Sequence, residues 1–134
     1  MEELIEKLNK DGFVVTSIEG NSMRPLLKKN KDKVIIEKTN DLHKLDIVLY
    51  KKDNKYLLHR LLKIDNNTLY LRGDNTLALE KININDVKGV LKSYYHLNSY
   101  IQINKYTNYK YYYLSLLTYP FRLIKAKLKR YANK

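Results

Sequence analysis

The 134-residue chain contains no cysteine and no tryptophan, only two prolines and four glycines, and no long apolar run. Without cysteine there is no disulfide and no thiolate metal site, and the three histidines are too scattered to suggest a metal centre. The longest apolar runs are a few residues, far short of the ~20 that a transmembrane helix needs. The sequence therefore implies no metal, no cofactor and no membrane span.

The N-terminus also lacks the features of a secretory signal. The segment MEELIEKLNKDG is acidic and polar, and no basic region followed by an apolar one is present. We therefore expect a cytoplasmic protein without a signal peptide. A hydrophobic content of 44% in a chain of this length is typical of one folded domain and excludes a wholly disordered chain.

Acidic residues are absent from the C-terminal third of the chain. Residues 1–86 carry 16 Lys/Arg and all 14 Asp/Glu, whereas residues 87–134 carry 10 Lys/Arg and no acid. The second segment also contains ten of the 13 tyrosines. This asymmetry predicts a folded domain over residues 1–93 and a basic Tyr/Lys-rich tail over residues 94–134.

Short apolar or β-branched segments between polar turns predict a mostly β fold of the α+β class. A helix is expected over residues 2–10, where Leu4, Ile5 and Leu8 share one face. Strands are expected over residues 13–18, 33–37, 46–52, 55–65, 68–73 and 86–95, in a compact antiparallel sheet or barrel. In the tail, a basic amphipathic helix is expected over residues 115–130, with Pro120 either kinking it or marking its start.

The stretch IEGNSMRPLL places Ser22 on a bend beside apolar residues. A serine hydroxyl becomes a nucleophile only when a base within hydrogen-bond reach removes its proton. His59 is a candidate base because it lies in the apolar segment YLLHRLLKI, where burial favours neutral imidazole. Asp74 in LRGDN and Glu80 six residues later are candidates to orient the ring. Taken singly, each feature also fits a purely structural role, such as a turn or a packed core residue.

Four motifs in order resemble the S24/S26 group of serine peptidases, which includes signal peptidase I and LexA-like enzymes. GNSMRPLL, LDIVLYK, LLHRLLKI and LRGDN resemble the group's Ser-Met-x-Pro, Gly-Asp-(Ile/Val)-Val, base-bearing strand and Gly-Asp-(Ala/Asn)-Asn, and the match spans roughly residues 12–93. The resemblance implies a signal-peptidase/LexA-like antiparallel β catalytic domain. It also implies a serine endopeptidase that cleaves an extended precursor or leader peptide.

The same resemblance implies roles for individual residues. Ser22 would be the nucleophile, and His59 would be the general base at the position where bacterial members carry lysine. This His-type arrangement resembles the archaeal and endoplasmic-reticulum signal peptidases. Glu80 stands near the position of the acid that completes the site in the His-type enzymes, and Asp74 belongs to the Gly-Asp turn that shapes the site or supports the base.

Two positions depart from the family's pattern. Leu45 replaces the glycine of the Gly-Asp-(Ile/Val)-Val motif, a change that we expect a strand entry to tolerate. Gly20 stands where some bacterial enzymes carry an oxyanion-hole serine, so the hole would use backbone N–H groups near the nucleophile with help from Asn21. Met23 and Pro25 are expected to fix the bend and line the substrate cleft.

Several alternatives stay open at this stage. The tail helix could dock on the domain with a solvated basic face, lie on an anionic membrane surface through residues 114–130, or bind nucleic acid. Nucleic acid is the weakest of the three because no RNA-binding motif is present. The alternative function is a catalytically silent S24/S26-like domain that binds peptide or membrane. A self-cleaving LexA-like regulator ranks last, because no helix-turn-helix segment precedes the catalytic part.

Overall fold

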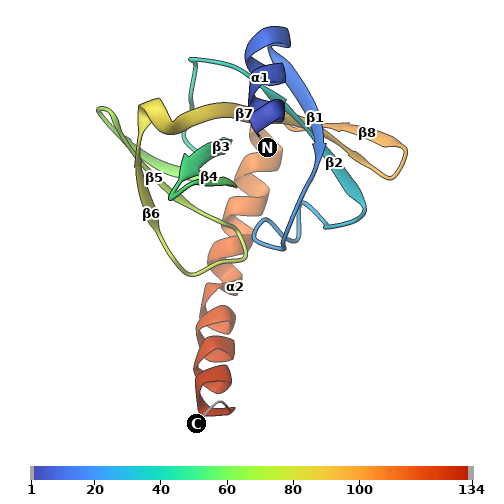
Figure 1. Ribbon diagram of the computed structural model, residues 1–134. Helices are drawn as coiled ribbons and strands as arrows, with labels where there is room; N and C mark the ends of the chain where they lie inside the picture. Colours follow the sequence, from blue (N-terminus) through green and yellow to red (C-terminus); the bar gives the residue numbers. More distant parts are fainter. Residues whose placement is uncertain (1, 133–134) are drawn as a thin grey trace.

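A curved antiparallel sheet of eight strands dominates the computed structural model, which describes residues 2–132 (Figure 1). The sheet order is β1-β2-β7-β3-β4-β5-β6, and β8 pairs with β7. The elements are α1 (Glu2–Asp11), β1 (Phe13–Ser17), β2 (Asp32–Glu37), β3 (Ile47–Lys52), β4 (Lys55–Asp65), β5 (Thr68–Arg72), β6 (Glu80–Asn83), a 3₁₀ turn η1 (Ile84–Asp86), β7 (Val87–His96), β8 (Ser99–Gln102) and α2 (Lys105–Ala132). The predicted mostly β fold with a helix at each end is confirmed.

The central strands β3 and β7 are buried on both faces, which divides the core into two clusters. In β3, Ile47 belongs to the first cluster, which also contains Leu8, and its neighbour Val48 belongs to the second. In β7, Leu91 and Val90 divide in the same way. Because successive side chains of a strand point to opposite faces, one strand contributes to both clusters. This explains why β3 begins with the run Ile47–Tyr50 and why β7 has the adjacent apolar pair Val90 and Leu91.

Helix α1 covers the first cluster. Its Leu8 is fully buried, and the helix ends at Gly12, whose φ of +82° places it in the left-handed region that favours glycine. The Gly12 N–H donates to the Leu8 carbonyl at 2.9 Å. The predicted helix and its Asp-Gly stop signal are confirmed.

The sequence prediction missed strands β6 and β8 and placed the start of α2 too late. The helix begins at Lys105, ten residues before the expected start, and runs through Pro120, so Pro120 does not mark its start. The side chain of Asn104 caps this end by accepting from the Thr107 N–H at 2.9 Å. The run of tyrosines that follows has modest helix propensity. Tyr111 nevertheless packs against the first cluster, so tertiary contacts stabilise this turn of the helix.

The predicted division of the chain at residue 93 falls inside β7 (Val87–His96). Beyond it, β8 continues the sheet, and Ile101, Ile103 and Tyr111 pack against the first cluster. The division into two domains stays a prediction. Among residues 2–132, no helix combines the length and apolarity needed to cross a bilayer.

Candidate active site

The turn that carries Ser22 is held by the turn that follows β5. The Asn75 N–H donates to the Ser22 carbonyl at 2.8 Å, and the Asn75 side-chain amide donates to the Asn21 carbonyl at 3.0 Å. The Asp74 N–H contacts the Met23 sulfur at 3.4 Å. Met23 is itself buried, which anchors the bend in the core. Two of the sequence motifs are thus joined by direct hydrogen bonds.

Gly73 lies between Ser22 and His59. A Cβ atom at Gly73 would stand 2.7 Å from the Ser22 carbonyl oxygen and 3.1 Å from Cδ2 of the His59 ring. The first distance is too short for any Cβ atom because it ends at a backbone oxygen, and the second is tight, so glycine is required for this approach. Within residues 2–132, no hydrogen bond joins the Ser22 hydroxyl to the His59 ring. The structure therefore gathers the two residues in one site while leaving their side chains unbonded.

The His59 ring is held through its Nδ1 atom. His59 pairs with Val48 across β3 and β4, which makes Tyr50, two residues along β3, its diagonal neighbour on the same face. The Tyr50 hydroxyl lies 2.9 Å from Nδ1, and a Glu80 carboxylate oxygen lies 3.6 Å from the same atom. Burial lowers the pKa of His59, and the carboxylates of Glu80 and Asp74 partly oppose that effect.

The direction of the hydrogen bond between Tyr50 and Nδ1 depends on the tautomer of His59. Burial and the nearby charge of Glu80 raise the pKa of Tyr50, so the phenol keeps its proton. In the tautomer that carries its proton on Nδ1, the ring donates to the phenol oxygen. That tautomer leaves the lone pair on Nε2, the nitrogen bonded to the Cδ2 atom that faces Gly73, and it is the tautomer that a general base at Nε2 requires. Lys52 lies 3.4 Å from Glu80 and balances its charge.

Asp74 pairs with Arg60 rather than with His59. The guanidinium Nε donates to Oδ1 at 2.9 Å and Nη2 donates to Oδ2 at 2.7 Å, and Arg60 is fully buried. Its Nη1 donates to the Leu45 carbonyl and to the Asn108 side chain of α2, both at 2.8 Å. This bidentate pair fixes the turn that holds Ser22, since Asp74 belongs to that turn.

Leu45 adopts an unusual backbone conformation beside this pair. It lies in a turn before β3 with φ of +79°, not in the extended backbone of the strand entry that we expected. That region favours glycine, the residue that the family pattern has at this position. Two contacts hold the turn in place: the Leu45 N–H donates to the Leu61 carbonyl at 2.7 Å, and its carbonyl accepts from Arg60.

Sequence reasoning missed Tyr50, and gave no role to Arg60 or Asn108. The alternation of DIVLYKK indicates an inward Tyr50, but its contact with His59 depends on the register of β3 and β4. Arg60 carried a clearer signal, because an arginine inside an apolar strand is rarely buried unless it is paired. The sequence gives no signal for Asn108.

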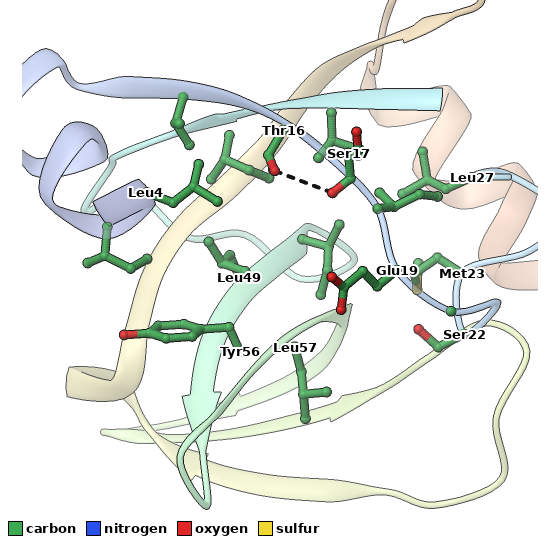
Figure 2. Close-up of a pocket in the computed structure, with 17 residues that line it drawn as sticks. Leu4, Thr16, Ser17, Glu19, Ser22, Met23, Leu27, Leu49, Tyr56 and Leu57 are labelled. Atoms are coloured by element: carbon green, nitrogen blue, oxygen red, sulfur yellow. Dashed lines mark hydrogen bonds between the residues drawn. The ribbon is translucent and has the colours of Figure 1, made fainter. Parts of the chain in front are cut away.

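An apolar pocket of about 480 Å³ opens beside Ser22. Figure 2 shows Ser22 and Met23 at one end and Leu4 and Tyr56 at the other. The lining comes from α1, β1, the Ser22 turn, β2, and the β3–β4 hairpin. Asn21 and Pro25, which we expected at the substrate cleft, are exposed and do not line this pocket, whereas Met23 does.

Comparison with known protein families identifies a match. The family model described as Peptidase S24-like matches residues 2–92, well over half of the chain. The matched segment contains Ser22, His59, Asp74 and Glu80 and ends within β7. No curated protein matches the chain.

Proposed function

The chain belongs to the Peptidase S24-like family, and on this basis we propose that it is a serine endopeptidase of the signal-peptidase-like type. Ser22 is the proposed nucleophile and His59 the proposed general base. One observation carries the proposal. The Ser22 turn is bonded to the Gly73–Asn75 turn, and the His59 ring lies on the other side of Gly73 with Nδ1 held by Tyr50.

In the proposed reaction, Nε2 of His59 takes the Ser22 proton as Oγ attacks the scissile carbonyl. The imidazolium gives that proton to the departing amine, and water then hydrolyses the acyl-enzyme with the same histidine as base. Backbone N–H groups near Ser22 stabilise the oxyanion, since Gly20 offers no side-chain donor. Hydrogen bonds of this kind often tighten only when substrate is bound, so we expect the Ser22–His59 bond to form in the complex.

Glu80 is the better candidate for the acid that supports His59. Its carboxylate lies 3.6 Å from Nδ1, so it would stabilise the imidazolium that forms during the reaction. Both oxygens of Asp74 are occupied by Arg60. We therefore assign Asp74 to positioning the turn that holds Ser22, and Tyr50 to holding the ring of His59.

An extended precursor or leader peptide fits the surface beside Ser22. Strand β1 ends the sheet order, so one of its edges pairs with no strand of the described chain, and β1 lines the apolar pocket. A free strand edge can pair with an extended peptide through backbone hydrogen bonds, while the pocket receives alternate side chains. In this proposal the peptide lies along β1 with its scissile bond near Ser22.

The experiment that tests the proposal is labelling by a serine-directed acylating probe. We expect Ser22 to be labelled, and His59→Gln to slow labelling by about 10²–10⁴-fold because the base is lost. The matched control is His43→Gln, since His43 is an exposed histidine whose side chain contacts Asp41 and Asp46. A labelling rate that His59→Gln does not change, or no labelling of the folded protein, would contradict the proposal and favour a silent peptide-binding domain.

The pH dependence tests the assignment of Glu80. Burial lowers the pKa of His59, so the neutral base persists below the ordinary histidine range and activity is lost only as pH falls through that lowered pKa. Glu80→Gln removes a charge that favours the imidazolium, so the acid limb of the rate profile should move to still lower pH. Profiles of labelling rate against pH measure this. An unmoved limb, or one moved to higher pH, would remove Glu80 from the site.

A further inference from the structure

Helix α2 carries an apolar stripe that faces away from the sheet. The stripe, here called the outer stripe, consists of Tyr113, Leu117, Phe121, Ile124, Leu128 and Tyr131. All six are exposed, from 55% for Ile124 to 81% for Tyr131. Their spacing of three or four residues places them on one side of the helix. An exposed apolar row of this length is unusual on a protein surface and marks a site of interaction.

The opposite side of α2 holds the helix to the sheet. Asn108, Ser115 and Arg122 recur every seven residues on this side. Asn108 accepts from Arg60 at 2.8 Å, Ser115 is buried, and Arg122 donates to the Thr76 carbonyl at 3.2 Å. These contacts fix the rotation of the helix about its axis. The outer stripe is therefore turned away from the sheet by the docking itself.

Basic residues border the outer stripe. At 100° per residue, Lys125 and Lys127 fall on its two sides, and Lys129 and Arg130 follow in the next turn. No acidic residue occurs after Asp86, so nothing on α2 offsets this charge. The combination of an apolar row, tyrosines and flanking lysines is the pattern of a helix that lies in a membrane interface.

We propose that α2 binds an anionic bilayer surface through its outer stripe. The apolar side chains would enter the boundary between headgroups and acyl chains, and the flanking lysines would remain at the lipid phosphates. Figure 1 shows the second half of α2 extending beyond the sheet, where the strands do not cover it. This proposal does not rest on the proposed peptidase activity.

Two other occupants fit the helix less well. A second copy of α2 laid along the outer stripe would bring Lys125, Lys127 and their equivalents together without any acid to pair with, which costs free energy. Nucleic acid would require cations at the centre of the contact to meet phosphates. Here the centre is Leu117, Phe121 and Ile124, and the cations lie at the margins.

The test is flotation of the full chain with lipid vesicles. We expect binding to vesicles that contain phosphatidylglycerol and much weaker binding to pure phosphatidylcholine, with the difference shrinking at high salt. Leu117→Ser/Leu128→Ser should lower the partition coefficient more than about tenfold, because both side chains enter the lipid. The matched control is Leu116→Ser/Leu123→Ser, which makes the same chemical change on the same helix beside the outer stripe. We expect a clearly smaller loss there.

Circular dichroism and the same flotation with Ser22→Ala complete the design. Both stripe leucines are exposed, 72% for Leu117 and 65% for Leu128, so the double variant should keep its fold.

Lys125→Gln/Lys127→Gln should lower binding to anionic vesicles alone. Equal loss in the stripe and control variants would overturn the proposal. So would a Leu117-dependent dimer in sedimentation with no vesicle binding, or binding to an oligonucleotide that exceeds binding to vesicles. Ser22→Ala should float like wild type, which separates this result from the peptidase proposal.

Discussion

Replacing Ser22 by alanine is expected to reduce kcat/KM for a cleaved peptide by about 10⁴-fold or more, because no other group then attacks the carbonyl. The turn itself should survive. It is held through the Ser22 carbonyl, the Asn21 carbonyl and the Met23 sulfur, none of which the change removes. Steady-state cleavage of one peptide by both proteins measures the effect.

Ser17→Ala is the matched control for this prediction. Ser17 also lines the apolar pocket, and it makes no side-chain hydrogen bond within the described part of the chain. Its loss should change kcat/KM by less than about threefold, since it removes one pocket contact and no reacting group. Comparable losses in both variants would show that the pocket, and not the Ser22 hydroxyl, limits the reaction.

Removing one partner of the buried Arg60–Asp74 pair should lower the free energy of unfolding far more than removing a partner of a surface ion pair. Asp74→Ala leaves a guanidinium with no exposed surface unpaired, and we expect the free energy of unfolding to fall by about 3–5 kcal/mol. Arg60→Met should cost a similar amount by leaving the carboxylate buried alone. The double variant Arg60→Met/Asp74→Leu leaves no unpaired buried charge. It should therefore lower the free energy of unfolding by less than the sum of the two single changes. Urea unfolding provides the values.

The control for this series is the ion pair between Glu2 and Lys51 on the surface. Its nitrogen and oxygen lie 3.6 Å apart, and both side chains are exposed to solvent. Exposed pairs contribute little, so Glu2→Ala should leave the unfolding midpoint unchanged. If Asp74→Ala were as harmless as Glu2→Ala, the buried pair would not hold the Ser22 turn.

The candidate site residues and their order could be predicted from the sequence, but the residues that position them could not. Ser22, His59 and the Gly-Asp turn could be found because each lies in a short local motif, and the structure brings those motifs together. Tyr50 could not be found, because its contact with His59 depends on how β3 and β4 are aligned. The pairing of Asp74 with Arg60 likewise depends on the turn after β5 folding back over β4. Local motifs point to the proposed reacting groups, whereas long-range pairing decides which residues position them.

Helix α2 shows the same limit in another form. Its basic charge and the three- and four-residue spacing of its apolar residues could be recognised in the sequence. Its start at Lys105, however, depends on packing of Tyr111 against the first cluster. The spacing also could not say which side of the helix faces the sheet. Asn108 and Arg122 decide that, through partners far away in the sequence. The strands β6 and β8 were missed because each is four residues long and is stabilised by a neighbouring strand.

The most direct test of peptide hydrolysis by Ser22 is digestion of a pool of precursor peptides, with products identified by mass spectrometry. Wild type, Ser22→Ala and Ser17→Ala would be compared at equal concentration. We predict defined cuts by wild type and Ser17→Ala and none by Ser22→Ala. Cuts that persist in Ser22→Ala would contradict this prediction, because the hydrolysis would then not depend on the proposed nucleophile.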